Sequence, residues 1–505
     1  MNGLSAYLTT LAPEIVLTVG ACAAILLGGR RAAPVALLAT LLAFGWVLGA
    51  GIDETRLPGL RFNALSFYVR AITLGVGLLI LLVNWHLPVA AERGEFFGMI
   101  LFSMTGVMLT GAANDLLVLF FSLELVSVPI YVLVALSSPD KRASEASVKY
   151  FFLGALTAAL MVYGFSFLYG VAGTTELFGA DGGGIAGYLA GGGMRAPYAL
   201  IGLALAFAGI AFKLAAFPFH VYAPDVYQGA ASTITGLLAF LPKLAGLTAL
   251  TIVLLAAGWN SGGRSAAIMW LLWIIAAGTM TVGNVLALLQ HNAKRILGYS
   301  SIAHSGYMLI GVLAGPAAGE GPLRDGTAAM LFYIVVYGVM NLGAFAALGA
   351  ISVDGRPAEE LEDLNGVART HPGLALALAI CVFSLMGLPP TAGFLGKVYV
   401  FSSAFSLPVT DPFRVPMIAL GIIGVVNAAI GAAYYLRIAA ACYLTEVKTP
   451  QQPAGDRALR FGLALCALAM LILFVWPRGL SRQAQQASRG LTSSEFRTAS
   501  VSERR

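Results

Sequence analysis

The chain consists mainly of apolar stretches of about 20 residues, separated by short polar connections. A helix of that length spans the hydrocarbon core of a bilayer. Backbone groups within lipid must find their hydrogen-bond partners in the protein, so only helices and closed barrels can cross. The runs are continuous and lack the alternation of a barrel strand, which favours helices.

Composition indicates that lipid, rather than water, is the main solvent of this chain. Of the 505 residues, 59% are hydrophobic and 11% are charged, whereas soluble domains carry about 25% charged residues. We predict an all-α polytopic transmembrane bundle of about 14 helices. The predicted spans are centred near Val19, Leu41, Gly77, Met104, Leu123, Leu160, Leu205, Leu244, Ile274, Leu309, Val336, Phe383, Ile423 and Leu468.

Two of these spans are interrupted, and each interruption lies close to a lysine. Residues 212–220 contain Lys213 and Pro218, and residues 387–397 contain Pro389, Pro390 and Lys397. Proline breaks a helix, and lipid tolerates this where the freed backbone faces protein or a water-filled cavity. The broken spans are the seventh and the twelfth, which predicts two inverted five-helix repeats with ion sites near the midplane. Two kinked structural helices are the alternative.

On these grounds we divide the chain into five parts. Residues 1–110 hold N-terminal transmembrane helices, residues 111–257 the first repeat (with a preceding span near 97–110) and residues 266–442 the second repeat. Residues 457–476 are a C-terminal transmembrane helix. Residues 477–505 are a tail rich in Ser, Gln and Arg, expected to be disordered or to lie on a partner.

The basic residues predict an orientation. With the N-terminus outside, thirteen Lys and Arg fall in inner loops and six in outer loops, although the tail adds six arginines on the outer side. Positive charge favours the inner side, so both termini are expected outside. The net charge of +6 is scattered over short loops and the tail, as expected beside anionic lipid, and we expect no nucleic-acid partner.

Four charged residues lie where an apolar span should exclude them. Lys213, Lys243 and Lys397 fall within spans, and Glu124 is more than two helical turns from the nearest charge, Asp115. A charge at the bilayer centre costs roughly 2.5–3.5 kcal/mol on insertion scales. Snorkelling or a static ion pair is the alternative reading, but the stem of a glutamate is too short to snorkel. We therefore predict that these residues carry protons.

The burial of these charged residues suggests how they could carry protons. Desolvation lowers the pKa of a lysine, and an adjacent carboxylate raises it again, so a lysine with a changing acidic partner can load and release a proton. We expect Glu124 and Lys213 to form this switch. Lys243 would then accept the proton laterally, and Lys397 would pass it to the opposite side. Lower-ranked candidates for intermediate steps are His291, His304, His220 and Lys294. The hydroxyls of Thr235, Ser300, Ser301 and Tyr307 could hold connecting waters, although such hydroxyls often bond to their own helix.

Other motifs give no soluble active site. Residues 182–187 match GxGxxG, but no strand precedes them and they fall between membrane spans, so we interpret the match as coincidental. The four cysteines Cys22, Cys381, Cys442 and Cys466 form no CxxC pair. We therefore expect neither an iron–sulfur nor a zinc site, and no cofactor in this chain.

Residues 218–230 read PFHVYAPDVYQGA. This segment resembles the broken seventh helix of the antiporter-like subunits of respiratory complex I, in the form typical of the subunit N type. Subunits L and M and the Mrp antiporters typically read PDAH there. Supporting segments are Asn114-Asp115 with residues 122–124, residues 290–304, and residues 387–390 with 393–397. One departure is visible, because the family usually has Pro-Thr-Pro where residues 231–233 read Ala-Ser-Thr.

The resemblance implies roles for four residues. The family's glutamate of the fifth span matches Glu124, and its lysines of the seventh, eighth and twelfth spans match Lys213, Lys243 and Lys397. It further implies that electrons pass from NADH to quinone on other subunits and drive proton translocation here. NADH, FMN, iron–sulfur clusters and quinone would then lie on other subunits or at their interfaces.

The resemblance also implies partners and a location. The expected partners are the antiporter-like M and L types, the small K, J and A types, the hydrophilic arm and the lipid bilayer. The expected location is the bacterial inner (plasma) membrane. Three alternatives stay open: an Mrp-type cation/proton antiporter subunit, a structural subunit that has lost pumping, and a membrane subunit of a related hydrogenase or photosynthetic complex.

Overall fold

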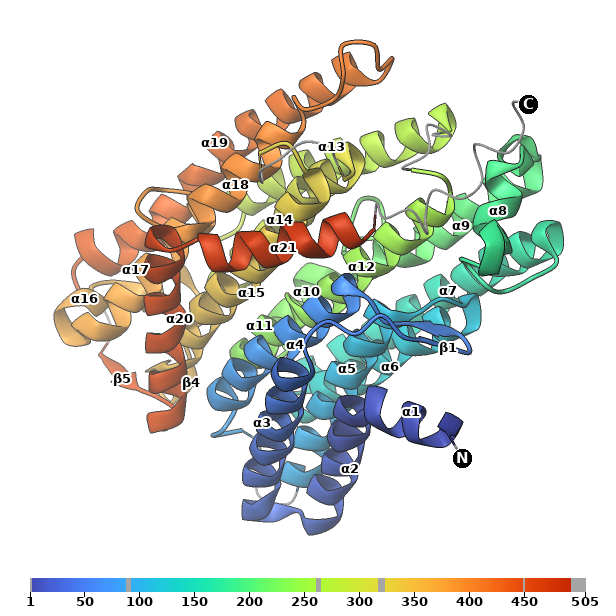
Figure 1. Cartoon of the computed structure of the whole chain (residues 1–505). Helices are drawn as coiled ribbons and strands as arrows, with labels where there is room; N and C mark the ends of the chain where they lie inside the picture. The colour runs from blue at the N-terminus through green and yellow to red at the C-terminus, as the bar shows by residue number, and fades with distance from the viewer. Residues whose placement is uncertain (1, 88–91, 260–264, 317–322, 448–449, 492–505) are drawn as a thin grey trace.

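The computed structural model describes residues 2–87, 92–259, 265–316, 323–447 and 450–491, and this part of the chain is mostly helical (Figure 1). Three parts of the sequence predictions lie outside the described residues: Arg264 and Lys448, which are two of the loop residues counted for the orientation, and residues 492–505 of the tail. The helices of the first half are α1 (Asn2–Thr10), α2 (Ala12–Leu27), α3 (Ala32–Ala50), α4 (Ala64–Val83), α5 (Arg93–Ala112), α6 (Leu116–Leu136), α7 (Lys141–Ala172), α8 (Gly184–Ala190), α9 (Pro197–Lys213), α10 (Ala223–Gly229), α11 (Ser232–Leu238) and α12 (Leu241–Ala256).

The second half contributes nine further helices among the described residues. These are α13 (Ala266–Leu288), α14 (Ala293–Ala314), α15 (Gly326–Gly349), α16 (Val367–Thr370), α17 (Pro372–Met386), α18 (Ala392–Ser403), α19 (Arg414–Leu444), α20 (Arg457–Val475) and α21 (Arg478–Gly490). Short strands form a β1–β2 hairpin (Arg56–Leu57, Leu60–Arg61) and a three-stranded sheet of β3 (Ile351–Val353), β4 (Arg356–Pro357) and β5 (Gln451–Pro453), in the order β4-β3-β5.

The predicted class, a polytopic α-helical membrane protein, is confirmed. In the described part, 11 helical segments are long and apolar enough to cross a membrane. Three shorter apolar helices, α2, α9 and α17, contain the remaining predicted centres near Val19, Leu205 and Phe383. The exact number of 14 crossings stays a prediction.

Both predicted interruptions are present, and they explain why two helices are short. Helix α9 ends at Lys213, and the chain leaves helical geometry before α10 begins at Ala223. Helix α17 ends at Met386, where Gly387 takes a left-handed conformation with φ of 84°. Glycine adopts this geometry without a steric penalty, so the chain can turn before α18 resumes at Ala392.

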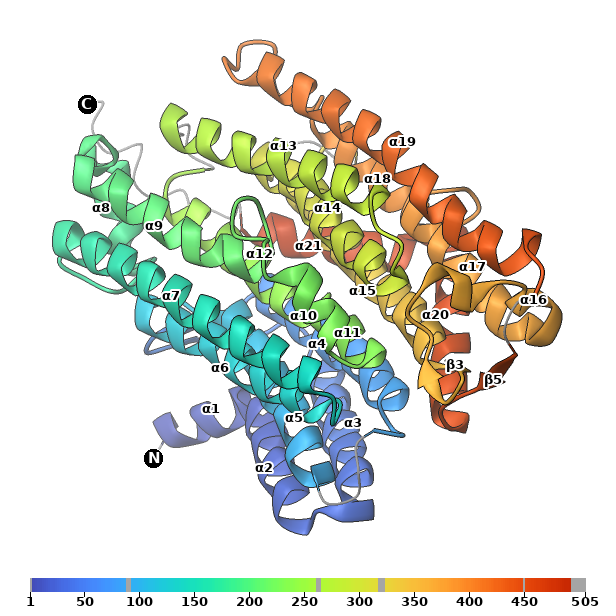
Figure 2. The ribbon, with the colours of Figure 1, turned by 180° about the vertical axis from the view of Figure 1, so that it is seen from behind.

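The helices pack into one bundle with two distinct ends. The end that we name the hairpin face carries β1–β2 and the bridges Leu60–Ala113 and Asp115–Glu176. The opposite end, named the basic face, carries the connections 137–141, 289–293 and 350–371. Figure 2 shows α7, α9, α13 and α19 following one another across the back of the bundle. Helix α15 lies inside and is buried along its membrane-spanning length, as is the α11–α12 segment.

The beginning of the tail is ordered, so the expectation of disorder is wrong for the part that is described. Arg478–Gly490 forms α21, which crosses the bundle and packs against α4 and α15 (Figure 1). Ala484 and Ala487 are buried on the side of α21 that faces the bundle, and Ser488 Oγ donates a hydrogen bond to Asp325 Oδ1 at 2.8 Å. The small side chains give a mostly polar segment one flat face for packing. Burial raises the pKa of the Asp325 carboxyl.

Candidate functional site

Lys213 and Glu124 form an ion pair inside the bundle. Lys213 is the last residue of α9 and is 3% exposed, and its Nζ lies 2.8 Å from Glu124 Oε1 of α6. The same ammonium donates to Ser127 Oγ at 2.6 Å, one turn further along α6. The side chain of Glu124 is 20% exposed. The structure therefore contains the expected pairing, whereas its role in proton transfer stays a prediction.

The break after Lys213 is held by side chains from two other helices. Ser305 Oγ of α14 donates to the carbonyl of Leu214 at 2.7 Å, and the amide of Phe217 donates to Thr279 Oγ1 of α13 at 2.9 Å. Non-helical backbone at membrane depth needs such partners. The break thus binds the first half of the chain to helices of the second half.

Lys243 of α12 is 1% exposed and lies in a set of hydroxyl groups. Its Nζ donates to the carbonyl oxygen and to Oγ of Ser301, the latter at 2.6 Å. Ser301 Oγ also contacts Tyr227 OH at 3.0 Å and accepts from Tyr337 OH at 2.8 Å. Ser305 Oγ reaches the Ser301 carbonyl at 3.3 Å. Ser305 therefore connects the break beside Lys213 with the environment of Lys243.

His304 lies between the environments of Lys243 and Lys397. Its Nδ1 is 2.7 Å from Tyr333 OH and its Nε2 is 2.9 Å from Tyr435 OH. The His304 ring lies near the Tyr337 ring, and Lys243 Nζ lies 5.2 Å from the centre of that tyrosine ring. A further ring neighbour is Tyr307, and Lys397 Nζ lies 5.3 Å from the centre of that ring. The imidazole thus has an aromatic neighbour in common with each lysine.

Lys397 of α18 is 6% exposed, and its Nζ donates to the Met386 carbonyl at 2.8 Å. That carbonyl ends α17, and the carbonyl end of a helix favours a cation. A Cβ on Gly387 would lie 2.8 Å from Lys397 Cδ, so the glycine leaves the space that the lysine stem occupies. Among the described carboxylates, none forms an ion pair with Lys243 or Lys397.

The lower-ranked residues are placed differently from one another. His220 lies buried in the break after α9, and no described group forms a hydrogen bond with its Nδ1. Lys294 is buried at the basic face, where it donates to the carbonyls of Gln228 and Ala230 and pairs with Glu359 at 3.2 Å. His291 is exposed in the connection between α13 and α14. The structure thus does not bring His291 into the row formed by Glu124, Lys213, Lys243, His304 and Lys397, of which Glu124 is partly exposed and the other four are buried.

Sequence reasoning missed several groups of this row. Ser127 was detectable, because it stands three residues after Glu124 and therefore on the same helical face. Tyr333 and Tyr337 stand four residues apart on an apolar helix, a spacing equally typical of packing. Tyr435 gave no signal, because its neighbour Ser300 is 135 positions away in the sequence. Thr235 donates to the carbonyl of Ala231, one turn back along its own helix, which is the alternative considered for hydroxyls, and also to the carbonyl of Tyr227 in α10.

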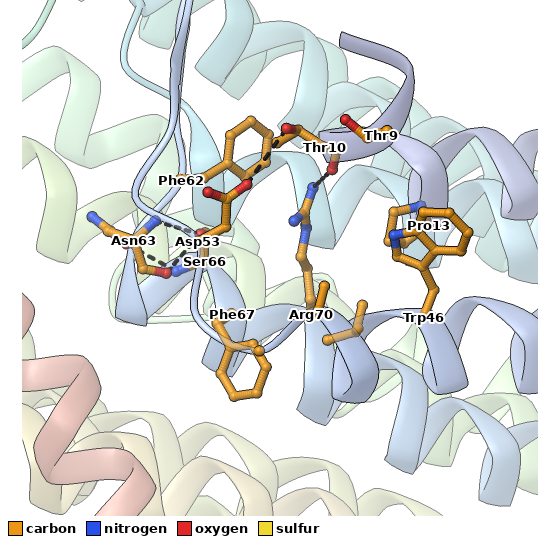
Figure 3. Close-up of a pocket in the computed structure, with 13 residues that line it drawn as sticks. Thr9, Thr10, Pro13, Trp46, Asp53, Phe62, Asn63, Ser66, Phe67 and Arg70 are labelled. Atoms are coloured by element: carbon orange, nitrogen blue, oxygen red, sulfur yellow. Dashed lines mark hydrogen bonds between the residues drawn. The ribbon is translucent and has the colours of Figure 1, made fainter. Parts of the chain in front are cut away.

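A second buried charge pair lies apart, in the N-terminal helices, and was not singled out from the sequence. Arg70 Nε donates to Glu14 Oε1 at 2.7 Å, and Nη2 donates to Glu14 Oε2 at 2.8 Å and to the Thr10 carbonyl at 3.0 Å. The guanidinium lies over Phe62 and borders a pocket that Trp46 also lines (Figure 3). These contacts fasten α1 and α2 to α4. Among the described residues no cluster of three His, Cys, Asp or Glu could hold a metal ion.

Comparison with known proteins gives one consistent family. The family model described as NADH:quinone oxidoreductase/Mrp antiporter, TM, matches residues 113–422. A protein of Rhodospirillum rubrum named NADH-quinone oxidoreductase subunit N is 34% identical, over 96% of this chain and 98% of its own length. NADH-quinone oxidoreductase subunit N 2 of Roseiflexus castenholzii is 39% identical, over 85% and 84% of the two chains.

Solved structures agree with this fold. A chain of respiratory complex I from Thermus thermophilus with bound aureothin has a TM-score of 0.76 and 28% identity, covering 93% of this chain and 98% of that one. A chain of the Mrp complex from Dietzia sp. DQ12-45-1b has a TM-score of 0.75 and 20% identity, covering 98% and 96%. The second likeness extends to the fold alone.

Proposed function

Because the chain belongs to the NADH-quinone oxidoreductase subunit N family, we propose that Glu124, Lys213, Lys243 and Lys397 form its proton-transfer path. The chain is a proton-translocating membrane subunit of that oxidoreductase, complex I. The observation that carries the proposed path is the row of three buried lysines and the partly exposed Glu124, bridged by Ser305, Ser301 and His304, between the two broken helices.

The Glu124–Lys213 pair acts as the switch of this path. While the carboxylate stays within 2.8 Å, it stabilises the ammonium form of Lys213. When the carboxylate moves away or is neutralised, the buried ammonium loses that support and gives up its proton. Ser305, which contacts both the break beside Lys213 and Ser301, marks the direction in which the proton leaves. Water bridging these hydroxyl groups carries it to the amine of Lys243.

The second part of the path runs from Lys243 to Lys397. His304 receives the proton on one ring nitrogen and releases it from the other, with Tyr333 and Tyr435 orienting the ring. Lys397 takes it up beside the Met386 carbonyl and hands it toward the hairpin face, where α18 ends at Ser403. His220 is a further proton-holding group in the first break. Lys294 and His291 belong to the basic face, where protons are taken up.

The energy comes from outside this chain. NADH, FMN, the iron–sulfur clusters and the quinone lie on other subunits or at their interfaces, and their redox steps bias the Glu124–Lys213 pair. The neighbours in the membrane are the M, L, K, J and A types of subunit. The protein lies in the bacterial inner membrane with both termini on the outer side, and residues 111–257 and 266–442 are its two inverted repeats.

Purification from native membranes tests the assignment to the complex. The tagged chain, extracted in mild detergent, is expected to bring hydrophilic subunits and NADH:quinone oxidoreductase activity with it. A chain that elutes alone, or only with small membrane subunits and without redox activity, would instead support an antiporter of the Mrp type.

A further inference from the structure

A polar pocket opens on the basic face beside α7 and α10. It has a volume of about 200 Å³, and its lining residues are Arg142, Glu145, Ala146, Lys149, Asp225, Gln228 and Gly229. Lys149 Nζ lies 2.7 Å from Glu145 and 3.5 Å from Asp225, and Arg295 contacts the same aspartate at 2.8 Å. The side chains of Glu145 and Asp225 are 66% and 45% exposed, so both carboxylates reach water. Such groups exchange protons with water rapidly.

Three buried tyrosines lie between this pocket and the ion pair. Tyr150 follows Lys149 on α7, and Tyr222 precedes Asp225 by three residues. Their rings stack with centres 4.9 Å apart, and Tyr131 of α6 meets Tyr150 edge-on at 4.6 Å. Tyr222 OH donates to the carbonyl of Phe212, the residue before Lys213, at 2.9 Å. The cluster therefore reaches from the pocket to the end of α9.

The hydroxyl of Tyr131 is buried, and no described group forms a hydrogen bond with it. Residues 124, 127 and 131 stand on one face of α6, at i, i+3 and i+7. Glycine at position 154 makes room for this hydroxyl, because a Cβ there would lie 2.0 Å from it. A buried hydroxyl without a partner is costly, and a bridging water would satisfy it.

We infer that this pocket, the tyrosine cluster and Ser127 form a proton-uptake route from the basic face to Lys213. The inference rests on the proposed function of Lys213. A proton from water in the pocket passes along hydroxyl groups and bridging water, each group taking one proton and giving its own onward. Ser127 delivers the last one to the neutral amine of Lys213, which becomes the ammonium that now donates to Ser127 at 2.6 Å.

Removal of single hydroxyls in the assembled complex tests the route. Tyr131→Phe keeps the ring and its packing, and Ser127→Ala removes the group that contacts Lys213. Each is expected to lower NADH-driven proton uptake into vesicles, per assembled complex, by about tenfold. This loss of rate is smaller than the factor of about 10²–10⁴ typical of removing an acid–base group, because a water molecule can partly replace the missing hydroxyl. The solvent deuterium isotope effect should rise, and Ser127→Thr should restore the rate.

Control variants distinguish a failure of the proposed uptake route from a failure of the proposed function of Lys213. Tyr163→Phe removes a hydroxyl from the exposed side of α7, where the residue is 58% exposed, and should pump normally. Normal pumping in Tyr131→Phe, or equal losses in Ser127→Ala and Ser127→Thr, would overturn the route. If the Lys213→Ala variant does not pump protons while the Tyr131→Phe and Ser127→Ala variants pump normally, the uptake route is wrong and the proposed function of Lys213 stands. If Lys213→Ala itself pumps normally, the proposed function fails.

Discussion

Ser305 of α14 donates a hydrogen bond to the carbonyl of Leu214 at 2.7 Å, directly after Lys213. The same hydroxyl lies 3.3 Å from the carbonyl of Ser301, to which Lys243 also donates. One buried side chain thus contacts both the broken helix and the neighbourhood of the next lysine. A conformational change at the Lys213 break would therefore alter the hydrogen bonds around Lys243 through Ser305.

The Ser305→Ala substitution should remove both contacts of this hydroxyl, the one with the Leu214 carbonyl and the one with the Ser301 carbonyl. The Leu214 carbonyl would be left buried without its partner, which costs about 1–3 kcal/mol. We expect a lower thermal stability of the complex and slower pumping, measured by thermal inactivation and by quenching of a pH-sensitive dye. Ser305→Thr keeps a hydroxyl and should retain most of the pumping. Equal rates in the alanine variant and the parent would contradict the coupling role.

Gly387→Ala should disturb Lys397. The φ of 84° costs an L-residue about 1–2 kcal/mol, and the new Cβ would press on the lysine stem at 2.8 Å. We expect reduced pumping at unchanged assembly, measured per complex. Gly373→Ala, near the start of the helix that Gly387 follows but with open space around its Cβ position, is the matched control and should behave as the parent. A normal Gly387→Ala variant would show that the position of Lys397 is not critical.

The loop at the basic face should lose stability in acid. Burial alone would raise the pKa of Asp363, but the hydrogen bonds from Arg356 at 2.8 Å and from the amides of Glu359 and Glu360 at 3.0 Å outweigh it and hold the pKa below its usual range. Because the folded pKa is depressed, the stabilisation is present above the unfolded value of about 3.9. It is lost as the pH falls through the folded value.

Proteolysis checks this prediction. Asp363→Asn should make the loop sensitive to trypsin at neutral pH, because its ion pair with Arg356 is removed. In the parent, pepsin should cut the loop faster as the pH falls below about 4. Glu362→Gln, an exposed neighbour, is the control and should resist trypsin. Equal resistance of the Asp363→Asn variant would mean that other contacts hold the loop.

The sequence predicted the features that violate the rules of a membrane span. A lysine in an apolar run and a proline in a helix are both costly, so Lys213, Lys397 and their breaks were visible without coordinates. The partner of Lys213 was also predictable, since Glu124 had no other explanation. The lysines, the prolines and the isolated glutamate stand out by local composition alone, whereas the pairing of Glu124 with Lys213 joins residues 89 positions apart.

The rest required three-dimensional packing. Ser305 and Tyr435 are an ordinary serine and tyrosine in the sequence, and only helix packing brings them to Lys243 and His304. The pair of Arg70 with Glu14 joins residues 56 positions apart. Glu14 lies in the first turn of α2, whereas Arg70 lies inside the span formed by α4, and only helix packing shows which carboxylate it meets. The order of α21 depends on the packing of its small buried side chains against α4 and α15, which composition does not reveal.

The most direct test of the central claim compares Lys213→Ala and Glu124→Ala with the parent, each in the assembled complex reconstituted into vesicles. Proton uptake per NADH oxidised is measured, with Lys141→Ala, an exposed lysine of the basic face, as control. We predict that both variants assemble but lose most of the coupled proton uptake, while the control is unchanged. Undiminished uptake in either assembled variant would remove that residue from the proton path.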